Sequence, residues 1–277
     1  MEEKKKIDLI ELNEEQAHFY NTPKTERKYN AVMKMWLVVR RRMYHLMNNS
    51  KVWDDVYALQ KEWMGDLSNK KVLDFGCYEG NALSFYLAEN AASYLGIDLS
   101  KRALQSLGEN FEKLGIKNAR LQCVDVLSSD FRESDFNIVY AQGVLHHFNP
   151  IDVLLPVLHK KLVPKGKIVS LDPLQTSFLT KSVRLVYHPF RSDKKWEWPF
   201  TTNTFASIKK YFNPVGIQGV MGYSKWAIPI AFLHKEIAVK VFRKLHSKDM
   251  ALSKNENRHL WRCMQVAMCL EKRADSD

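Results

Sequence analysis

The sequence predicts an α/β protein with a doubly wound, mostly parallel β-sheet. Three observations support this fold class. Short apolar runs alternate with stretches of helical periodicity through residues 66–175. The first run leads directly into two glycines, Gly76 and Gly80, and later runs end in acidic residues. Because strands that alternate with helices are joined by right-handed crossovers, they form a parallel sheet.

The first strand and its turn lie at Lys71–Gly80, where an apolar run with an internal acid, Asp74, ends in the two glycines. Glycine permits tight turns and a close approach of the backbone to a ligand. A helical pattern follows at Asn81–Glu89, and the free N–H groups of its first turn face the same ligand space. The second strand, Ser93–Asp98, ends in an acid that can accept hydrogen bonds from ribose hydroxyls.

Three further strands are expected at Ala119–Asp125, Phe136–Tyr140 and Gly166–Asp172. Ligands of doubly wound sheets bind beyond the carboxyl ends of the strands. That rule places the glycine turn along one edge of the sheet together with Asp98, Asp125, Gln142 and Asp172.

The rest of the chain reads mostly as helices. Before the sheet we expect helices at Glu11–Tyr20, from Thr22 to Met47, and at Val52–Met64, forming a cap over the ligand cleft with Tyr20 at its edge. After the fifth strand we expect a helix at Thr201–Phe212, a sixth strand at Val220–Trp226, an amphipathic helical stretch at 228–248, and a last strand at Leu260–Leu270.

Charge and cysteine usage narrow the functional classes. The net charge is +11, and residues 166–277 alone carry +10, which suits an anionic substrate, a membrane surface or nucleic acid, or serves only solubility. Neither a signal peptide nor an apolar run long enough to cross a bilayer is evident. We expect a cytoplasmic protein with buried, reduced thiols at Cys77, Cys123, Cys263 and Cys269.

Five motifs then resemble those of class I S-adenosyl-L-methionine (SAM)-dependent methyltransferases. They are Leu73–Gly80, Gly96–Ser100, Cys123–Val126, Gly143–Phe148 and Leu162–Lys167, and the resemblance is good over residues 66–175. The chain looks most similar to bacterial enzymes that act on small molecules, glycans or lipids. The resemblance implies a Rossmann-like, seven-stranded sheet whose last strand is antiparallel. It also implies a helical cap at 1–65 and a methyltransferase domain at 66–277, with substrate-side insertions at about 173–203 and 227–256.

The resemblance also implies which residues bind the cofactor. Asp98 would bind the ribose, Asp125 the adenine amino group, and Gln142 and Gly143 the methionine part. The full implied set is Asp74, Gly76, Cys77, Tyr78, Gly80, Asp98, Leu99, Asp125, Val126, Gln142 and Gly143. One member departs from the family, because Tyr78 stands where a glycine is usual. We favour a tolerated substitution over the alternative of a cofactor-free relative.

The segment Phe178–Phe200 mixes basic and aromatic residues with two prolines, and in this fold it borders the substrate pocket. Arg191 could clamp a carboxylate or phosphate, and the tryptophans could stack on a ligand or pack beneath the cap. The expected substrate residues are Tyr20, Tyr187, Arg191, Trp196 and Trp198. The candidate general bases are His146, His147, His188 and Glu197, although the His146–His147 pair is also common as a structural feature of the family.

The resulting functional hypothesis is a SAM-dependent methyltransferase that acts on a small or lipid-linked metabolite bearing a hydroxyl group. The motifs of enzymes that methylate exocyclic amino groups or cytosine C5 are missing. No acid stands near Ala141, where catechol-type enzymes hold a metal, so we expect none. An RNA methyltransferase and a membrane-associated scaffold without turnover stay open as alternatives. The basic amphipathic stretch at 228–248 favours peripheral contact with an anionic membrane over contact with nucleic acid.

Overall fold

The computed structural model describes residues 2–23, 26, 29–191 and 193–274, and within α7 it leaves the side chains of Leu179, Thr180, Val183 and Tyr187 undescribed. The strands are β1 Lys71–Phe75, β2 Ser93–Asp98, β3 Ala119–Cys123, β4 Phe136–Gln142, β5 Leu162–Pro173, β6 Phe212–Val220 and β7 Gln265–Lys272. The helices are α1 Glu2–Asn21, α2 Ala31–Asn49, α3 Val52–Met64, α4 Ala82–Asn90, α5 Lys101–Lys113, α6 Leu154–Lys161, α7 Phe178–Tyr187, α8 Thr202–Tyr211 and α9 Lys235–Leu252.

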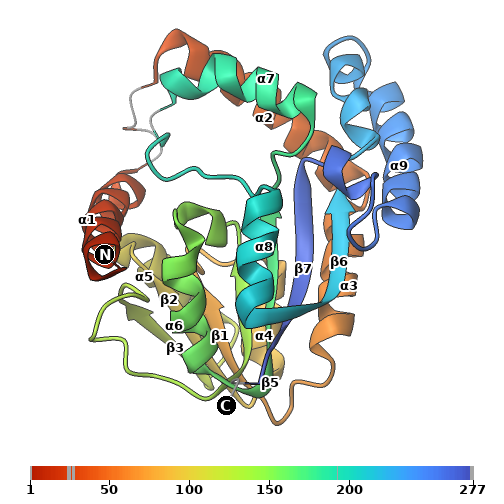
Figure 1. The fold of residues 1–277 in the computed structure, drawn as a ribbon. Helices are drawn as coiled ribbons and strands as arrows, with labels where there is room; N and C mark the ends of the chain where they lie inside the picture. The colour runs from red at the N-terminus through yellow and green to blue at the C-terminus, as the bar shows by residue number, and fades with distance from the viewer. Residues whose placement is uncertain (1, 24–25, 27–28, 192, 275–277) are drawn as a thin grey trace.

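The seven strands form one sheet in the order β3-β2-β1-β4-β5-β7-β6 (Figure 1). Strands β1 to β5 are parallel, and β7 runs antiparallel to both of its neighbours, β5 and β6. The order reverses between β1 and β4, so the cleft that such sheets use for ligands opens beyond these two strands. The predicted fold class is therefore confirmed.

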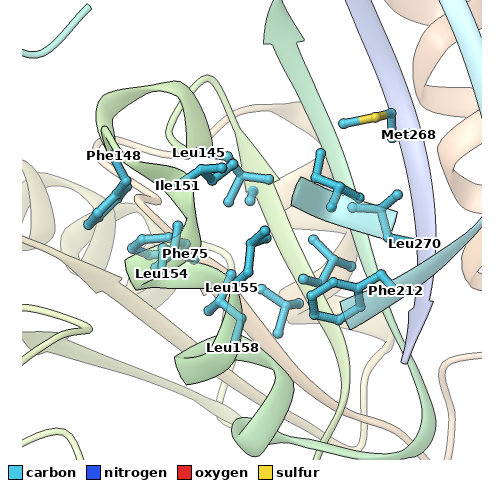
Figure 2. Close-up of a cluster of buried hydrophobic side chains, with 14 of the residues drawn as sticks. Phe75, Leu145, Phe148, Ile151, Leu154, Leu155, Leu158, Phe212, Met268 and Leu270 are labelled. Carbon is cyan, nitrogen blue, oxygen red and sulfur yellow. The ribbon is translucent and has the colours of Figure 1, made fainter. Parts of the chain in front are cut away.

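Each face of the sheet is covered by its own helical layer. On one face, α6 and α8 pack on apolar side chains of β4, β5 and β7, and Figure 2 shows part of this cluster. On the other face, α4, α5 and the end of α3 cover β1, β2 and β4. The end of α3 packs directly on the sheet. This helix was expected to belong to the cap at residues 1–65, but in the structure it forms part of the layer that covers the sheet.

Polar caps fix where several helices begin. The Asn81 side chain accepts hydrogen bonds from the amides of Leu83 and Ser84, so α4 starts immediately after the glycine turn. Ser100 caps α5 in the same way, two residues after Asp98. These caps hold the first turns of α4 and α5 at the carboxyl edge of the sheet.

The predicted sixth strand at Val220–Trp226 is wrong, because β6 occupies Phe212–Val220. Pro214 and two glycines are unfavourable in strands, so the amino-acid propensities of this segment do not predict one. β6 lies at the edge of the sheet, where proline is tolerated. A Cβ on Gly216 would lie 2.6 Å from the Trp63 ring, and one on Gly219 would lie 2.5 Å from Cys263 Sγ, so packing requires both glycines.

Other boundaries also differ, and the second helix begins at Ala31 rather than at Thr22. The first helix starts at Glu2 rather than Glu11, and the last strand is Gln265–Lys272 rather than Leu260–Leu270. The stretch at 228–248 is broken, because residues before α9 form short 3-10 turns, including Pro229–Phe232. None of the described helices is long and apolar enough to span a membrane. Three of the cysteines are buried as expected, but Cys123, at the end of the edge strand β3, is exposed.

One buried carboxylate fastens α9 to the sheet. Asp249 is fully buried and accepts hydrogen bonds from the amides of Gly222, Tyr223 and Ser224 and from the Ser224 hydroxyl. These donors belong to the segment that leaves β6. The carboxylate therefore joins the C-terminal half of α9 to that segment.

We expect Asp249→Ala to lower the free energy of unfolding by about 3 kcal/mol, because it strands several buried donors. Urea denaturation monitored by circular dichroism measures this change. The exposed Asp130 provides the control, and Asp130→Ala should stay within about 0.5 kcal/mol of the wild type. Equal effects of the two substitutions would contradict the assigned role.

Candidate active site

The glycine turn after β1 folds back on the end of β2. The amides of Gly76 and Cys77 both donate to the carbonyl of Ile97, and Gly76 has φ +71°. A Cβ on Gly76 would collide with Val144 at 2.8 Å, so the turn packs tightly against the segment after β4. Gly80, with φ +77°, packs on Leu107 of α5 in the same way. Both glycines are thus required by backbone conformation and by close packing.

Tyr78 adopts a left-handed backbone conformation, which usually favours glycine. Its φ is +47°, and its amide donates to Asp98 Oδ2 over 2.9 Å. Its hydroxyl accepts a hydrogen bond from Arg102, and its ring lies edge-on to Tyr20 of α1. The turn therefore forms with a tyrosine in place, and the side chain spans from α5 to α1.

A cavity of about 180 Å³ lies beyond this turn at the carboxyl edge of the sheet. Eight of the eleven predicted cofactor residues line it: Gly76, Tyr78, Asp98, Leu99, Asp125, Val126, Gln142 and Gly143. The other three support the turn from below or from the side. Asp74 is buried and accepts a hydrogen bond from the Tyr94 hydroxyl, while Cys77 is buried and Gly80 packs on α5.

Asp98, at the end of β2, and Asp125, just after β3, line this cavity and can each accept further hydrogen bonds. Asp98 accepts from the amides of Tyr78 and Ser100, and Asp125 accepts from the Leu127 amide and the Asn13 side chain. A carboxylate offers about four acceptor positions, so each acid retains room for a ligand donor. Burial raises the pKa of both carboxyl groups. With the open backbone at Gly143, which has no atom within 4 Å of its Cβ position, the lining fits a ribose- and adenine-bearing cofactor such as SAM.

Helix α1 contributes a row of residues that sequence reasoning missed, apart from Tyr20. Asn13 donates to Asp125 over 2.8 Å, Gln16 donates to Asn13 over 2.9 Å, and Gln16 Oε1 pairs with His147 Nδ1 at 3.0 Å. Tyr20 stacks on the His147 ring at 6.3 Å. The sequence does contain a signal for this row, because residues 13, 16 and 20 are spaced so that they share one face of a helix. Their polar character within a cap helix indicates a buried polar partner.

A second, larger cavity of about 700 Å³ lies between α7 and the segment that leads to α8. Of the predicted substrate-side residues, His188, Glu197 and Trp198 line it. Arg191 is instead buried in an ion pair with Asp193, and Trp196 is buried against Phe19 of α1. Tyr20 lines the smaller cavity, and the Tyr187 side chain lies outside the described residues.

A cluster of charged groups separates the two cavities. His147 lines the smaller cavity and Glu197 the larger one, with His146 buried beside both. The Nε2 atoms of His146 and His147 lie 3.7 Å and 3.9 Å from the two oxygens of Glu197. Arg191 lies 3.2 Å from Glu197 Oε2, and Asp172 Oδ1 lies 2.8 Å from His146 Nδ1. The structure thus unites three of the four candidate bases, while His188 lies on the wall of the larger cavity.

Within the cluster, burial and neighbouring charges raise the pKa of one member and lower the pKa values of two others. Burial alone would lower the pKa of His146, but Asp172 and Glu197 outweigh it and raise this pKa to about 9. Burial, together with the charges of His146 and Arg191, lowers the pKa of His147 to about 3. Burial would raise the pKa of Glu197, but His146 and Arg191 hold it well below its usual range.

Comparison with known proteins yields one family match. A family model described as a methyltransferase domain matches residues 47–220. An uncharacterized protein of Haemophilus influenzae is 29% identical over 107 residues, which is 38% of this chain and 42% of that protein. A ribosomal protein L11 methyltransferase of Actinobacillus succinogenes is 32% identical over 114 residues, covering 40% and 37% of the two chains. The matches thus span about two fifths of the length of these curated relatives.

Solved structures share the fold at low sequence identity. The YcgJ protein of Bacillus subtilis superposes with a TM-score of 0.56 at 13% identity, over 80% of this chain and all of that one. A geranyl diphosphate C-methyltransferase of Streptomyces coelicolor, solved with S-adenosyl-L-homocysteine, gives a TM-score of 0.56 at 11% identity, covering 80% and 81% of the two chains.

The placement of Asp98 generates a prediction about cofactor binding. We expect Asp98→Ala to weaken binding of S-adenosyl-L-homocysteine by about 1–3 kcal/mol, because ribose donors lose their acceptor. Calorimetric titration measures this loss. Asp130→Ala, which changes an exposed aspartate away from the cavity, is the control. Unchanged affinity in Asp98→Ala would overturn the role of Asp98.

Proposed function

This chain belongs to the methyltransferase domain family, and on that premise we propose that it transfers a methyl group from SAM to a hydroxyl of a lipid-linked or other small apolar metabolite. The observation that carries the proposal is the pair of adjoining cavities. One is lined by the predicted cofactor residues, and the other is mostly apolar. The charged cluster of His146, His147 and Glu197 stands between them.

When bound, SAM supplies a methyl group on a sulfonium, whose sulfur keeps the electron pair of the bond that breaks and becomes a neutral thioether. The protein has to hold the acceptor oxygen in line with that methyl group and remove its proton. His147 reaches the cofactor cavity and Glu197 the acceptor cavity, so a hydroxyl placed between them is in reach of both. The hydroxyl donates a hydrogen bond to this pair, which orients its oxygen toward the methyl group. Because the pKa values of His147 and Glu197 are low, the proton passes to solvent as the new C–O bond forms.

The lining of the larger cavity supports an acceptor with an apolar body and a negative charge. Apolar walls come from Phe148, Ile151, Leu185 and Phe200. Three basic side chains join them: Lys181, Arg184 and His188. Apolar walls suit an acyl or prenyl chain, and the basic groups suit a phosphate or carboxylate. Trp198, which is 43% exposed, borders the same space and offers a flat surface for stacking.

The exposed surface around this cavity supports peripheral contact with a membrane. Helices α7 and α2 lie above the carboxyl edge of the sheet (Figure 1). Both expose large apolar side chains. Phe178 is 85% exposed and Leu185 is 78% exposed on α7, and Met35 is exposed on α2. Lys34 and Lys181 are exposed beside them. An apolar surface flanked by lysines suits an anionic lipid interface.

This surface differs from the stretch at 228–248 that the sequence favoured. Phe242 and Ala238 are fully buried, so the apolar face of α9 packs against the protein. Leu233 and Ile237 stay exposed at the start of that stretch. The proposed membrane contact therefore centres on α7 and α2, beside the mouth of the acceptor cavity.

The acceptor class can be tested with SAM that carries a radiolabelled methyl group and an extract of bacterial membrane lipids. We expect the label to enter the organic phase. Trp198→Ala should reduce this transfer about tenfold, equal to about 1.4 kcal/mol, while leaving S-adenosyl-L-homocysteine binding intact. Label that appears only in water-soluble products would contradict a lipid-linked acceptor. Equal loss of binding and transfer would indicate damage to the fold.

Membrane contact predicts that the protein co-sediments with anionic phospholipid vesicles at low salt and is released as salt rises. Leu185→Glu should weaken this binding at least fivefold, because it places a charge in the apolar surface. Leu114→Glu is the matched control, since Leu114 is 58% exposed after α5, at the opposite end of that helix from the carboxyl edge of the sheet. A wild-type chain that ignores vesicles but retains RNA on a filter would favour a nucleic-acid substrate.

A further inference from the structure

The hydrogen-bond donors and acceptors of α1 determine which nitrogen of His147 carries a proton. The carboxylate of Asp125 only accepts, so Asn13 must present its Nδ2 to it. Asn13 then turns its Oδ1 toward Gln16, which must donate from Nε2. Gln16 consequently presents Oε1 to His147, so His147 Nδ1 must be the donor. This leaves the lone pair of His147 on Nε2.

The same reasoning fixes His146 from the other side of the cluster. Asp172 Oδ1 accepts from the His146 backbone amide over 3.2 Å and from its Nδ1 over 2.8 Å. Its second oxygen, Oδ2, is buried and has no hydrogen-bond partner among the described residues. Because Asp172 only accepts, His146 donates from Nδ1, and its Nε2 points toward Glu197.

The Nε2 atoms of both rings therefore face the two oxygens of Glu197, and the Nε2 of His147 carries a lone pair. The separations are 3.7 Å for His146 and 3.9 Å for His147. Arg191, 3.2 Å from Glu197 Oε2, offsets part of the carboxylate charge, but the lone pair of His147 still faces Glu197 Oε1, which is repulsive unless a positive species lies between them. A single proton on His146 would bridge to one oxygen of Glu197 and leave His147 Nε2 unsatisfied. A cation at the centre would satisfy all three groups at once.

We propose that His146, His147 and Glu197 bind one divalent transition-metal ion of the zinc type. Their ligand atoms all lie within 4.8 Å of one another. Tetrahedral zinc, with bonds of about 2.0–2.1 Å, separates its ligand atoms by about 3.3 Å, so a small rotation of the side chains closes the site. Two histidines and one carboxylate match the ligand set of catalytic zinc sites, which keep a fourth position open.

The surroundings supply the groups that hold such ligands in place. Ligating histidines usually donate their second N–H to a carboxylate or carbonyl, as His146 does to Asp172 and His147 to Gln16. Ligating carboxylates are themselves hydrogen-bonded, and Arg191 lies 3.2 Å from Glu197 Oε2 while pairing with Asp193. The acids Asp172, Asp193 and Glu197 offset the charge of the ion and of Arg191. The sequence expectation of no metal considered only an acidic set near Ala141, and these ligands come from elsewhere.

The catalytic consequence rests on the proposed function. The open position would lie between the two cavities, because His147 lines one and Glu197 the other. An acceptor hydroxyl bound there would have its pKa lowered by the ion and would lose its proton more easily before methylation. Metal binding itself needs no acceptor and can be measured alone.

The test titrates Zn²⁺ into the chelator-treated 277-residue chain against a chromophoric competitor, with Co²⁺ absorption as a second readout. We expect one ion per chain. Glu197→Gln and His147→Gln should each weaken binding at least a hundredfold, and Gln16→Leu about tenfold through loss of orientation. His45→Gln, at an exposed histidine of α2, is the matched control and should leave the affinity unchanged. Circular dichroism and thermal unfolding confirm that each variant is folded.

Zinc affinity that is equally weak in the wild type and in the double variant His147→Gln/Glu197→Gln would overturn the proposal. The cluster would then be an ion-pair network closed by a proton on His146. Methyl transfer to lipid by a zinc-free chain at full rate would also overturn the metal role, and the proposed function would stand. Stoichiometric zinc without any transfer to lipid would support the site and contradict the proposed acceptor.

Discussion

The parallel direction of β1 to β5 is the constraint on which the site depends. Since parallel strands end at the same edge, they bring together residues that are nearly 100 positions apart in sequence, from Gly76 to Asp172. The crossing of the chain between β1 and β4 opens space at that edge. Buried apolar side chains on both faces hold the strands in register, so the polar groups at the edge are placed by packing elsewhere.

The second organising feature is the polar face of α1. A helix laid over a cavity normally presents apolar side chains, but α1 presents Asn13 and Gln16, both almost fully buried. Buried amides need partners, and these two find them in Asp125 and His147. The row therefore joins Asp125 to the histidine cluster. Through it, the carboxylate of Asp125 orients the His147 ring between the two cavities.

The order of elements between residues 66 and 175 could be predicted from sequence because local pattern and global fold agree there. The β6 strand could not, since its proline and glycines are explained by an edge position and by the rings and sulfur packed against them. The placement of Asp98 and Asp125 at the cavity could be predicted because Asp98 ends β2 and Asp125 closely follows β3. The ion pair of Arg191 and its contact with Glu197 were not, because the fold of the segment after α7 decides which way these side chains point. Asn13 and Gln16 were visible as a helical row, but their partners lie more than 100 residues away.

Tyr78 departs from the family pattern without disrupting the glycine turn, and it adds contacts between that turn and helices α1 and α5. A left-handed conformation costs a bulky residue about 1–2 kcal/mol, so the tyrosine must gain contacts that glycine cannot make. It gains one on each side, from Arg102 of α5 and from the Tyr20 ring of α1. Its amide still reaches Asp98, so the turn keeps the hydrogen bond that orients this acid. Tyr78, Tyr20 and His147 then follow one another as neighbouring rings along the cofactor cavity. The tyrosine thus belongs with α1, because a glycine at this position would leave that helix without one of its contacts to the turn.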